Sequence, residues 1–117
     1  MRERLPDRRM SATEKITHGP HSFFVTIGID RMGNIKEVFY ADGQRSGSDL
    51  QHAITDACVI ISIALQHGVT PDEMFRSLAS VPVVEWADGE PVERHVPASI
   101  MGAIVNHIMI RGGMTHD

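Results

Sequence analysis

The strictest constraint on the fold is an alternating segment that begins at Ser22. Between Ser22 and Asp30, large apolar residues occupy every second position: Phe23, Val25, Ile27 and Ile29. A period of two with aromatic and β-branched residues predicts a strand with one buried face. Residues 30–34 predict a turn in which Gly33 or Asn34 takes a positive φ, and residues 35–41 predict the returning strand. The sequence therefore predicts an antiparallel β-hairpin.

A long amphipathic helix is predicted to follow, because apolar residues recur three and four positions apart from Leu50 to Leu65. Ser48 and Gln51 have the spacing of a capping box, and Gly68 suits the position after the last turn. The segment Thr70-Pro71-Asp72-Glu73 predicts the start of a second helix that ends near Ala79. A third helix is expected over residues 97–110, ended by the glycine pair at 112 and 113.

The segment between the second and third helices, residues 80–97, combines an extended piece and a turn. Residues 81–86 favour a short extended piece, which Pro82 confines to a sheet edge, and residues 87–91 favour a turn. The fold class is α+β, with the hairpin packed against three helices. A two-stranded sheet is only marginally stable on its own. Besides the helices, we therefore expect the sheet to be completed by a third strand, from residues 1–17 or 81–86, or by a second copy of the chain.

The length of 117 residues predicts one domain, over residues 18–117, preceded by an arm over residues 1–17. The first fifteen residues hold five basic and three acidic residues. The remainder holds six basic and twelve acidic residues, a net charge of −6. This acidic body disfavours nucleic acid as a partner. Residues 4–9 allow two interpretations, a docking segment or a solvated tail, and composition favours the tail.

No apolar run reaches the roughly 18 residues of a membrane span, and the amino terminus lacks the apolar core of a signal peptide. A cytoplasmic location is therefore expected. The single cysteine, Cys58, excludes an internal disulfide and a Cys-rich zinc site, and a small buried hydrophobe is its expected role.

No catalytic or metal-binding pattern is recognisable. His52 and His67 share the first helix, but their separation of about 22 Å along its axis prevents them from sharing an ion. The other five histidines have no ligand-like spacing, and Asp72 and Glu73 are explained by helix capping. Neither a phosphate loop nor a dinucleotide fingerprint is present. We expect no metal, no cofactor and no enzymatic activity.

One segment is a candidate ligand site. Arg45, Ser46, Gly47 and Ser48 stand at the start of the first helix, where free backbone N–H groups attract an anion. Arg45 suits a phosphate or a carboxylate. The alternative, which we favour, is that Ser48 only caps the helix, Gly47 only turns the chain and Arg45 is solvated. Asp49 also competes for the same N–H groups.

Several segments together resemble the TSCPD domain, which lies near the carboxyl terminus of adenosylcobalamin-dependent ribonucleotide reductases. The resemblance covers roughly residues 22–110 and rests on the order and spacing of residues 24–28, 33–39, 47–49, 61–69, 97–100 and 102–104. Residues 4–9 are also similar to the start of small stand-alone relatives.

The departures from this pattern are informative. The segment around Ser80-Val81-Pro82 lacks the cysteine of the Thr-Ser-Cys-Pro-Asp signature, and residues 112–117 lack the cysteine-rich tail of the reductases. The catalytic barrel is missing, so no reductase residue can be transferred to this chain. The resemblance implies a shared fold and a shared kind of contact, without reductase activity or cobalamin binding.

Two functional hypotheses follow. The first is a non-catalytic accessory, interaction or regulatory module, expected to be a homo-oligomer (a dimer) and to bind a protein of nucleotide metabolism. The second is a small-ligand binding protein that holds a nucleotide or another anion at residues 45–49.

Overall fold

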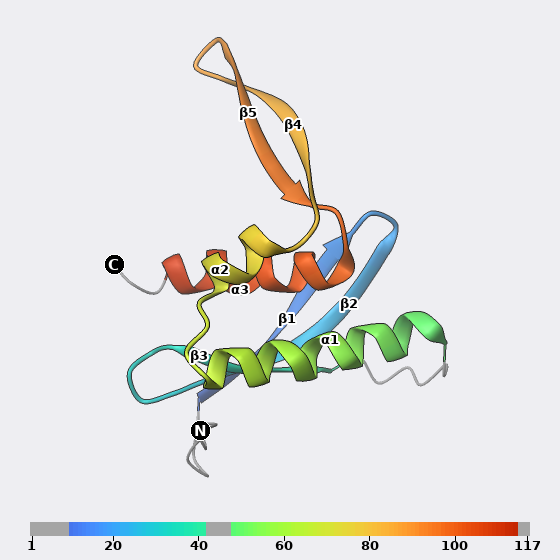
Figure 1. Ribbon diagram of the computed structural model, residues 1–117, viewed down its shortest axis with the longest axis vertical. Helices are drawn as coiled ribbons and strands as arrows, with labels where there is room; N and C mark the ends of the chain where they lie inside the picture. The colour runs from blue at the N-terminus through green and yellow to red at the C-terminus, as the bar shows by residue number, and fades with distance from the viewer. Residues whose placement is uncertain (1–9, 42–47, 115–117) are drawn as a thin grey trace.

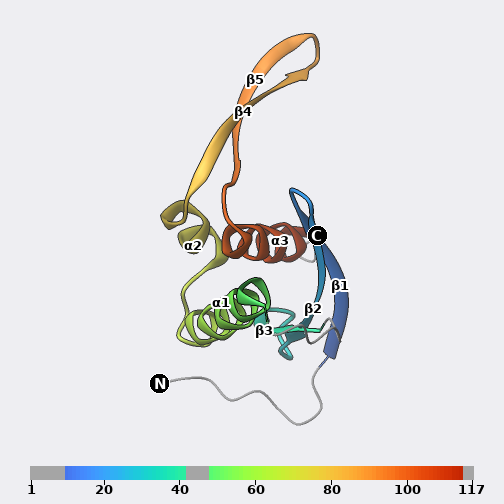
Figure 2. The ribbon, with the colours of Figure 1, turned by 90° about the vertical axis from the view of Figure 1, so that its right-hand side faces the viewer.

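The structure confirms the α+β fold. The computed structural model describes residues 10–41 and 48–114. In chain order these residues form β1 (Met10–His18), β2 (His21–Ile29), β3 (Ile35–Tyr40), α1 (Asp49–Gln66), α2 (Pro71–Ser77), β4 (Ser80–Ala87), β5 (Glu90–Pro97) and α3 (Ile100–Met114). A three-stranded antiparallel sheet has the order β1-β2-β3, and β4 and β5 make a separate ribbon. Helices α1 and α3 lie on the same face of the sheet, as Figures 1 and 2 show.

The predicted hairpin is formed by β2 and β3. Its turn is held by the Asp30 carboxylate, which accepts the backbone N–H groups of Met32 and Asn34, both at 2.9 Å. Gly33 takes the positive φ, at 85°, and glycine adopts this conformation without a steric cost. On β2 the alternation places Phe23, Val25 and Ile27 in the core, as predicted.

The third strand comes from the amino-terminal segment. β1 pairs antiparallel with β2 from Met10 opposite Ile29 to His18 opposite His21. The connection has two residues, and Gly19 takes φ 57°, which suits the primed turns of such hairpins. The part of the expected arm from Met10 onward therefore belongs to the sheet.

Both helical caps on α1 and α2 follow the sequence prediction. Ser48 Oγ accepts the Gln51 N–H at 3.2 Å, and Thr70 and Glu73 form a complete capping box at α2. Gly68, with φ 89°, ends α1 in a Schellman motif, because its N–H reaches Leu65 O at 3.1 Å and the next N–H reaches Ala64 O at 3.0 Å.

The core lies between the sheet and the two long helices. Its buried members come from β1, β2, β3, α1 and α3, and they are Ile16, Phe23, Val25, Ile27, Val38, Ile54, Ala57, Cys58, Ile61, Leu65, Ala103, Ile104, Val105 and Ile108. Aliphatic side chains dominate this set. The hydrophobic effect on these residues is the main source of stability for the sheet–helix body.

The two edges of the sheet differ. At the β3 edge, buried Ser62 of α1 accepts the Val38 N–H at 2.9 Å and donates to Val38 O at 3.1 Å. Gln66 Nε2 donates to Lys36 O at 3.0 Å. Helix α1 therefore covers one edge with side-chain hydrogen bonds, which is a common protection against unwanted strand pairing. In the described part of the chain no strand pairs with the other edge, along β1.

The β4–β5 ribbon, residues 80–97, is called the arm from here on, and it is distinct from the amino-terminal arm that was expected over residues 1–17. It projects from the body along the longest axis of the molecule, whose extent is 49 Å (Figure 1). Just below its base, a hydrogen bond from Ala98 N–H to Ala79 O connects the segments that lead into and out of the ribbon. Nearly all of its residues are exposed, and the Trp86 side chain is 74% exposed.

Three boundaries differ from the sequence prediction. The segment 80–97 forms two full strands rather than one short extended piece. Helix α3 begins at Ile100 rather than at residue 97, because Ser99 Oγ accepts the Gly102 N–H at 3.0 Å and so caps the helix. The glycine pair does not end α3, which continues to Met114, since a glycine costs a helix only about 1 kcal/mol.

Candidate functional site

The predicted anion site is only partly within the described residues. Arg45, Ser46 and Gly47 lie outside them, whereas Ser48 is described. The Ser48 hydroxyl is exposed and accepts the Gln51 N–H as an N-cap. This is the capping role that we favoured for Ser48. Anion binding at residues 45–49 stays a prediction.

Cys58 is buried on α1, as expected, and burial raises the pKa of its thiol to about 12. A thiol with this pKa is a poor nucleophile at neutral pH. Across residues 10–41 and 48–114, no three His, Cys, Asp or Glu side chains converge as metal ligands would. No helix in these ranges is long and apolar enough to cross a membrane.

A charged cluster joins β1 to α3, and sequence analysis missed it. Glu14 accepts hydrogen bonds from two residues of α3, His107 Nε2 at 2.6 Å and Arg111 Nε at 2.7 Å. The Glu14 side chain is only 22% exposed, and both partners are also largely buried. The cluster therefore connects β1, whose outer edge pairs with no described strand, to α3.

The environment of Glu14 pulls its pKa in two directions. Burial disfavours the charged form and raises the pKa. The hydrogen bonds and charges of Arg111 and His107 favour the charged form and outweigh burial, so the pKa lies below its ordinary value of 4.5. Glu14 is therefore a carboxylate at neutral pH, and its charge is shared by both partners.

A groove opens beside this cluster, between β1, the end of β5 and α3. It has a volume of about 240 Å³, and its polar lining comes from Lys15, His18, Asn106, His107 and Arg111, with Pro97 at the base of the arm. Two of its polar residues, His107 and Arg111, already share the Glu14 carboxylate. Lys15 lines the groove from β1, but its position opposite exposed Phe24 places its side chain on the other face of the sheet.

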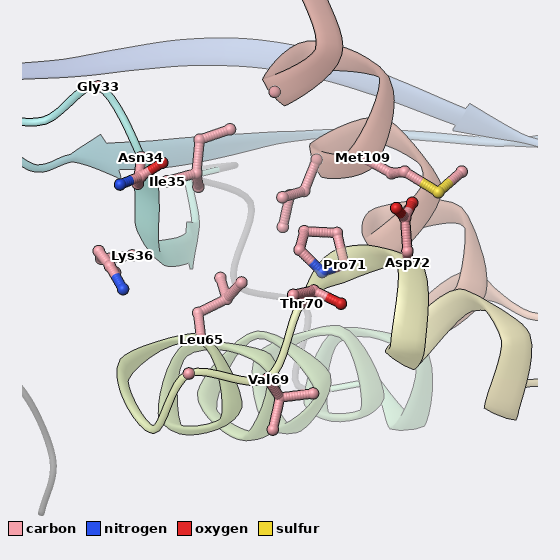
Figure 3. Close-up of a pocket in the computed structure, with 13 residues that line it drawn as sticks. Gly33, Asn34, Ile35, Lys36, Leu65, Val69, Thr70, Pro71, Asp72 and Met109 are labelled. Carbon is pink, nitrogen blue, oxygen red and sulfur yellow. The ribbon is translucent and has the colours of Figure 1, made fainter. Parts of the chain in front are cut away.

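A larger cavity of about 400 Å³ lies where the end of α1, the start of α2, the start of β3 and α3 meet (Figure 3). Ile35, Leu65, Val69 and Met109 give it an apolar lining, as Figure 3 shows. The Thr70 hydroxyl at its rim is engaged in the capping box of α2. Its lining also includes Lys36 and Asp72, so apolar and charged residues face the same cavity.

The face of the sheet opposite α1 and α3 is not covered by any described helix (Figure 2). We call it the outer sheet face, and its central residues are Thr13, Lys15, Phe24, Thr26 and Phe39. The two phenylalanines are diagonal neighbours on paired strands, and each is 45% exposed. Exposed aromatic side chains on a rigid sheet are typical of protein interaction surfaces.

The fold and its surfaces define an α+β domain with a projecting ribbon and a sheet face that no described helix covers and that exposes two phenylalanines. The chain belongs to the TSCPD domain family, whose model matches residues 1–109. It is 35% identical over 72 residues to a vitamin B12-dependent ribonucleotide reductase of Bradyrhizobium diazoefficiens. It has the same identity over 72 residues to the vitamin B12-dependent ribonucleotide reductase of Agrobacterium fabrum.

These matches cover 62% of the chain but only 6% of each reductase. The chain therefore spans a small fraction of the length of the curated relatives that it matches. No solved structure matches the chain significantly. The resemblance proposed from residues 22–110 is confirmed at the level of the family.

Proposed function

We propose that this chain is a non-catalytic accessory module that binds a ribonucleotide reductase of the vitamin B12-dependent class. The observation that carries this proposal is the outer sheet face, where Phe24 and Phe39 are each 45% exposed on paired strands. Two aromatic rings held by a sheet can act as anchors without losing much side-chain freedom on binding.

The choice of partner rests on the relatives. In the matching reductases, the homologous segment is 6% of a much longer chain, so it exists there beside the rest of the reductase. A domain of the same family can keep a surface for that kind of contact. The outer sheet face suits this role because α1 and α3 already occupy the opposite face.

The proposal is tested by measuring binding of the chain to the purified reductase of the source organism, immobilised on a sensor. The wild-type chain should bind saturably. The double variant Phe24→Asp/Phe39→Asp should bind at least about ten times more weakly, because it removes two aromatic anchors and buries two charges. Circular dichroism checks that the variant folds, and Phe24→Ala/Phe39→Ala is the milder alternative.

The matched control is Val59→Asp. Val59 lies on α1 with a similar exposure, 50%, and far from the outer sheet face. This variant should bind the reductase as the wild type does. Absence of binding by the wild type, or equal loss with Val59→Asp, would contradict the proposal.

A further inference from the structure

The outer edge of β1, which pairs with no described strand, exposes main-chain hydrogen-bonding groups. The β1–β2 connection has two residues, so His18 and His21 are the hydrogen-bonded pair that closes the hairpin. Bonding alternates along an antiparallel strand, so every second residue of β1 turns its N–H and C=O groups away from β2. β1 has no proline and no bulge against β2, and its edge is therefore regular enough to take a further strand.

The groove beside the Glu14 cluster lies along this edge. Lys15 and Thr17 line it although their side chains lie on the outer sheet face, so the groove reaches their main-chain groups. Its other wall is a single stripe of α3, made of Ala103, Asn106, His107, Ile110 and Arg111. An edge strand with a groove beside it suits the addition of a further strand, whose alternate side chains enter the groove.

A second copy of β1 fits this edge, and charge selects its register. Residues that face each other across paired strands share one face of the sheet, so a two-fold axis that keeps the helices of both copies on one face passes through a single position of β1. An axis at Glu14 or Lys15 places two like charges directly opposite each other, which is destabilising. An axis at Thr13 avoids this, because Lys15 then faces Ser11 and Glu14 faces Ala12. Every other axis that avoids like charges pairs fewer of the described residues.

This register brings exposed apolar side chains into contact. Met10 of one copy lies opposite Ile16 of the other, and both side chains lie on the face that α3 covers. Met10 is 72% exposed, and Ile110 in the wall of the groove is 54% exposed. The Met10 side chain of each copy therefore enters the groove of the other, where Ile16, Ala103 and Ile110 supply apolar contacts. A flexible methionine adapts well to such an irregular space.

We propose that two copies of this chain form a dimer by pairing their β1 strands antiparallel about a two-fold axis at Thr13, with Met10 of each copy in the groove of the other. The two three-stranded sheets then join into one continuous sheet. The helices of both copies cover the same face of it. The outer sheet faces lie side by side on the opposite face, so the dimer leaves Phe24 and Phe39 accessible to a reductase.

Sedimentation velocity tests the contact that Met10 makes. The wild type should be a dimer at about 100 μM. The dimers of Met10→Asp and Ile110→Asp should each dissociate at least about ten times more readily, because each substitution places a charge in the apolar part of the groove. The matched controls are Met32→Asp and Ile60→Asp, at positions that are 82% and 55% exposed and outside the groove. Both controls should dimerise as the wild type does, and circular dichroism checks that all four variants fold.

Engineered cysteines test the register. In the proposed dimer the two Thr13 residues form a hydrogen-bonded pair with Cα atoms about 5.5 Å apart, a distance that a disulfide can span. Thr13→Cys should therefore cross-link the two copies on mild oxidation. Ser11→Cys should not, because its two copies lie about 13 Å apart along the strands. The native Cys58 is buried and does not compete.

A wild type that is monomeric at about 100 μM would overturn the proposal. A dimer that neither Met10→Asp nor Ile110→Asp weakens would overturn it too, as would a Thr13→Cys variant that fails to cross-link. The reductase-binding proposal stands or fails separately, because Phe24 and Phe39 lie on the opposite face of the sheet from Met10.

Discussion

Replacing Glu14 by glutamine should destabilise the fold measurably, because the Glu14 carboxylate is the acceptor that His107 and Arg111 of α3 share. Hydrogen bonds to a charged group contribute about 1.5–3 kcal/mol each when well formed. The Glu14 side chain is 22% exposed. Solvent therefore screens its interactions with His107 and Arg111 more than those of a fully buried carboxylate and less than those of a surface carboxylate. We therefore expect a loss of about 2 kcal/mol for the cluster as a whole.

The effect on thermal unfolding follows from the chain length. An unfolding entropy of about 2.1 cal/mol/K per residue over 117 residues gives about 0.25 kcal/mol/K, so the Tm should fall by about 8 °C. Urea unfolding at pH 7, followed by circular dichroism, gives the free energy directly. The control Asp56→Asn, at an exposed position of α1, should change stability by less than about 0.5 kcal/mol.

The pH dependence provides a second check on Glu14. Its folded-state pKa is lower than the unfolded value of 4.5, so its stabilising contribution is complete above that value. The contribution is lost as the pH falls through the lower folded-state pKa. The stability difference between the wild type and Glu14→Gln should therefore shrink in strongly acidic solution. A difference below about 0.5 kcal/mol at pH 7, or one that is constant down to pH 3, would refute the reasoning.

Three further predictions follow. Ser62→Ala should cost about 1–3 kcal/mol in urea unfolding, because the buried Val38 N–H then has no acceptor; an unchanged midpoint would show that water or a neighbouring group replaces the hydroxyl. Cys58, whose thiol pKa burial raises to about 12, should resist alkylation at pH 8 in the native protein and react at once in urea; rapid native labelling would contradict its burial. If residues 45–49 bind a nucleotide, ATP should raise the Tm of the wild type and leave that of Arg45→Ala unchanged; equal responses would remove the anion hypothesis.

Local signals made much of the fold predictable. The period of two over residues 22–30 and the turn at Gly33 are encoded within a few residues, and both were predicted correctly. The caps at Ser48 and Thr70 are also local, because each cap bonds a backbone N–H only three positions away. Such patterns involve only neighbouring residues, so they are recognisable without knowledge of the tertiary structure.

The strand β5 was missed because the arm has no buried face. Without one, residues 90–97 show no contrast between apolar and polar positions, which is the signal that identifies most strands. The available signal was the dipeptide Asp88-Gly89, which takes positive φ at both positions, 53° and 80°, as a two-residue hairpin turn requires.

The Glu14 cluster could not be predicted from local patterns, since its partners lie 93 and 97 positions further along the chain. A weak signal was the inward alternation of Ala12, Glu14 and Ile16, which marks Glu14 as a charge on a buried face. A charge at such a position needs a partner. Only the packing of α3 against β1 identifies which residues supply it.

The most direct test of the reductase-binding proposal is hydroxyl-radical footprinting of the chain alone and with the purified reductase, read out by mass spectrometry. Phe24 and Phe39 report on the outer sheet face, and Met32, at 82% exposure in the β2–β3 turn, is the internal reference. Our account predicts that the reductase slows oxidation of both phenylalanines while Met32 is oxidised as before. Equal oxidation of Phe24 and Phe39 with and without the reductase would contradict it.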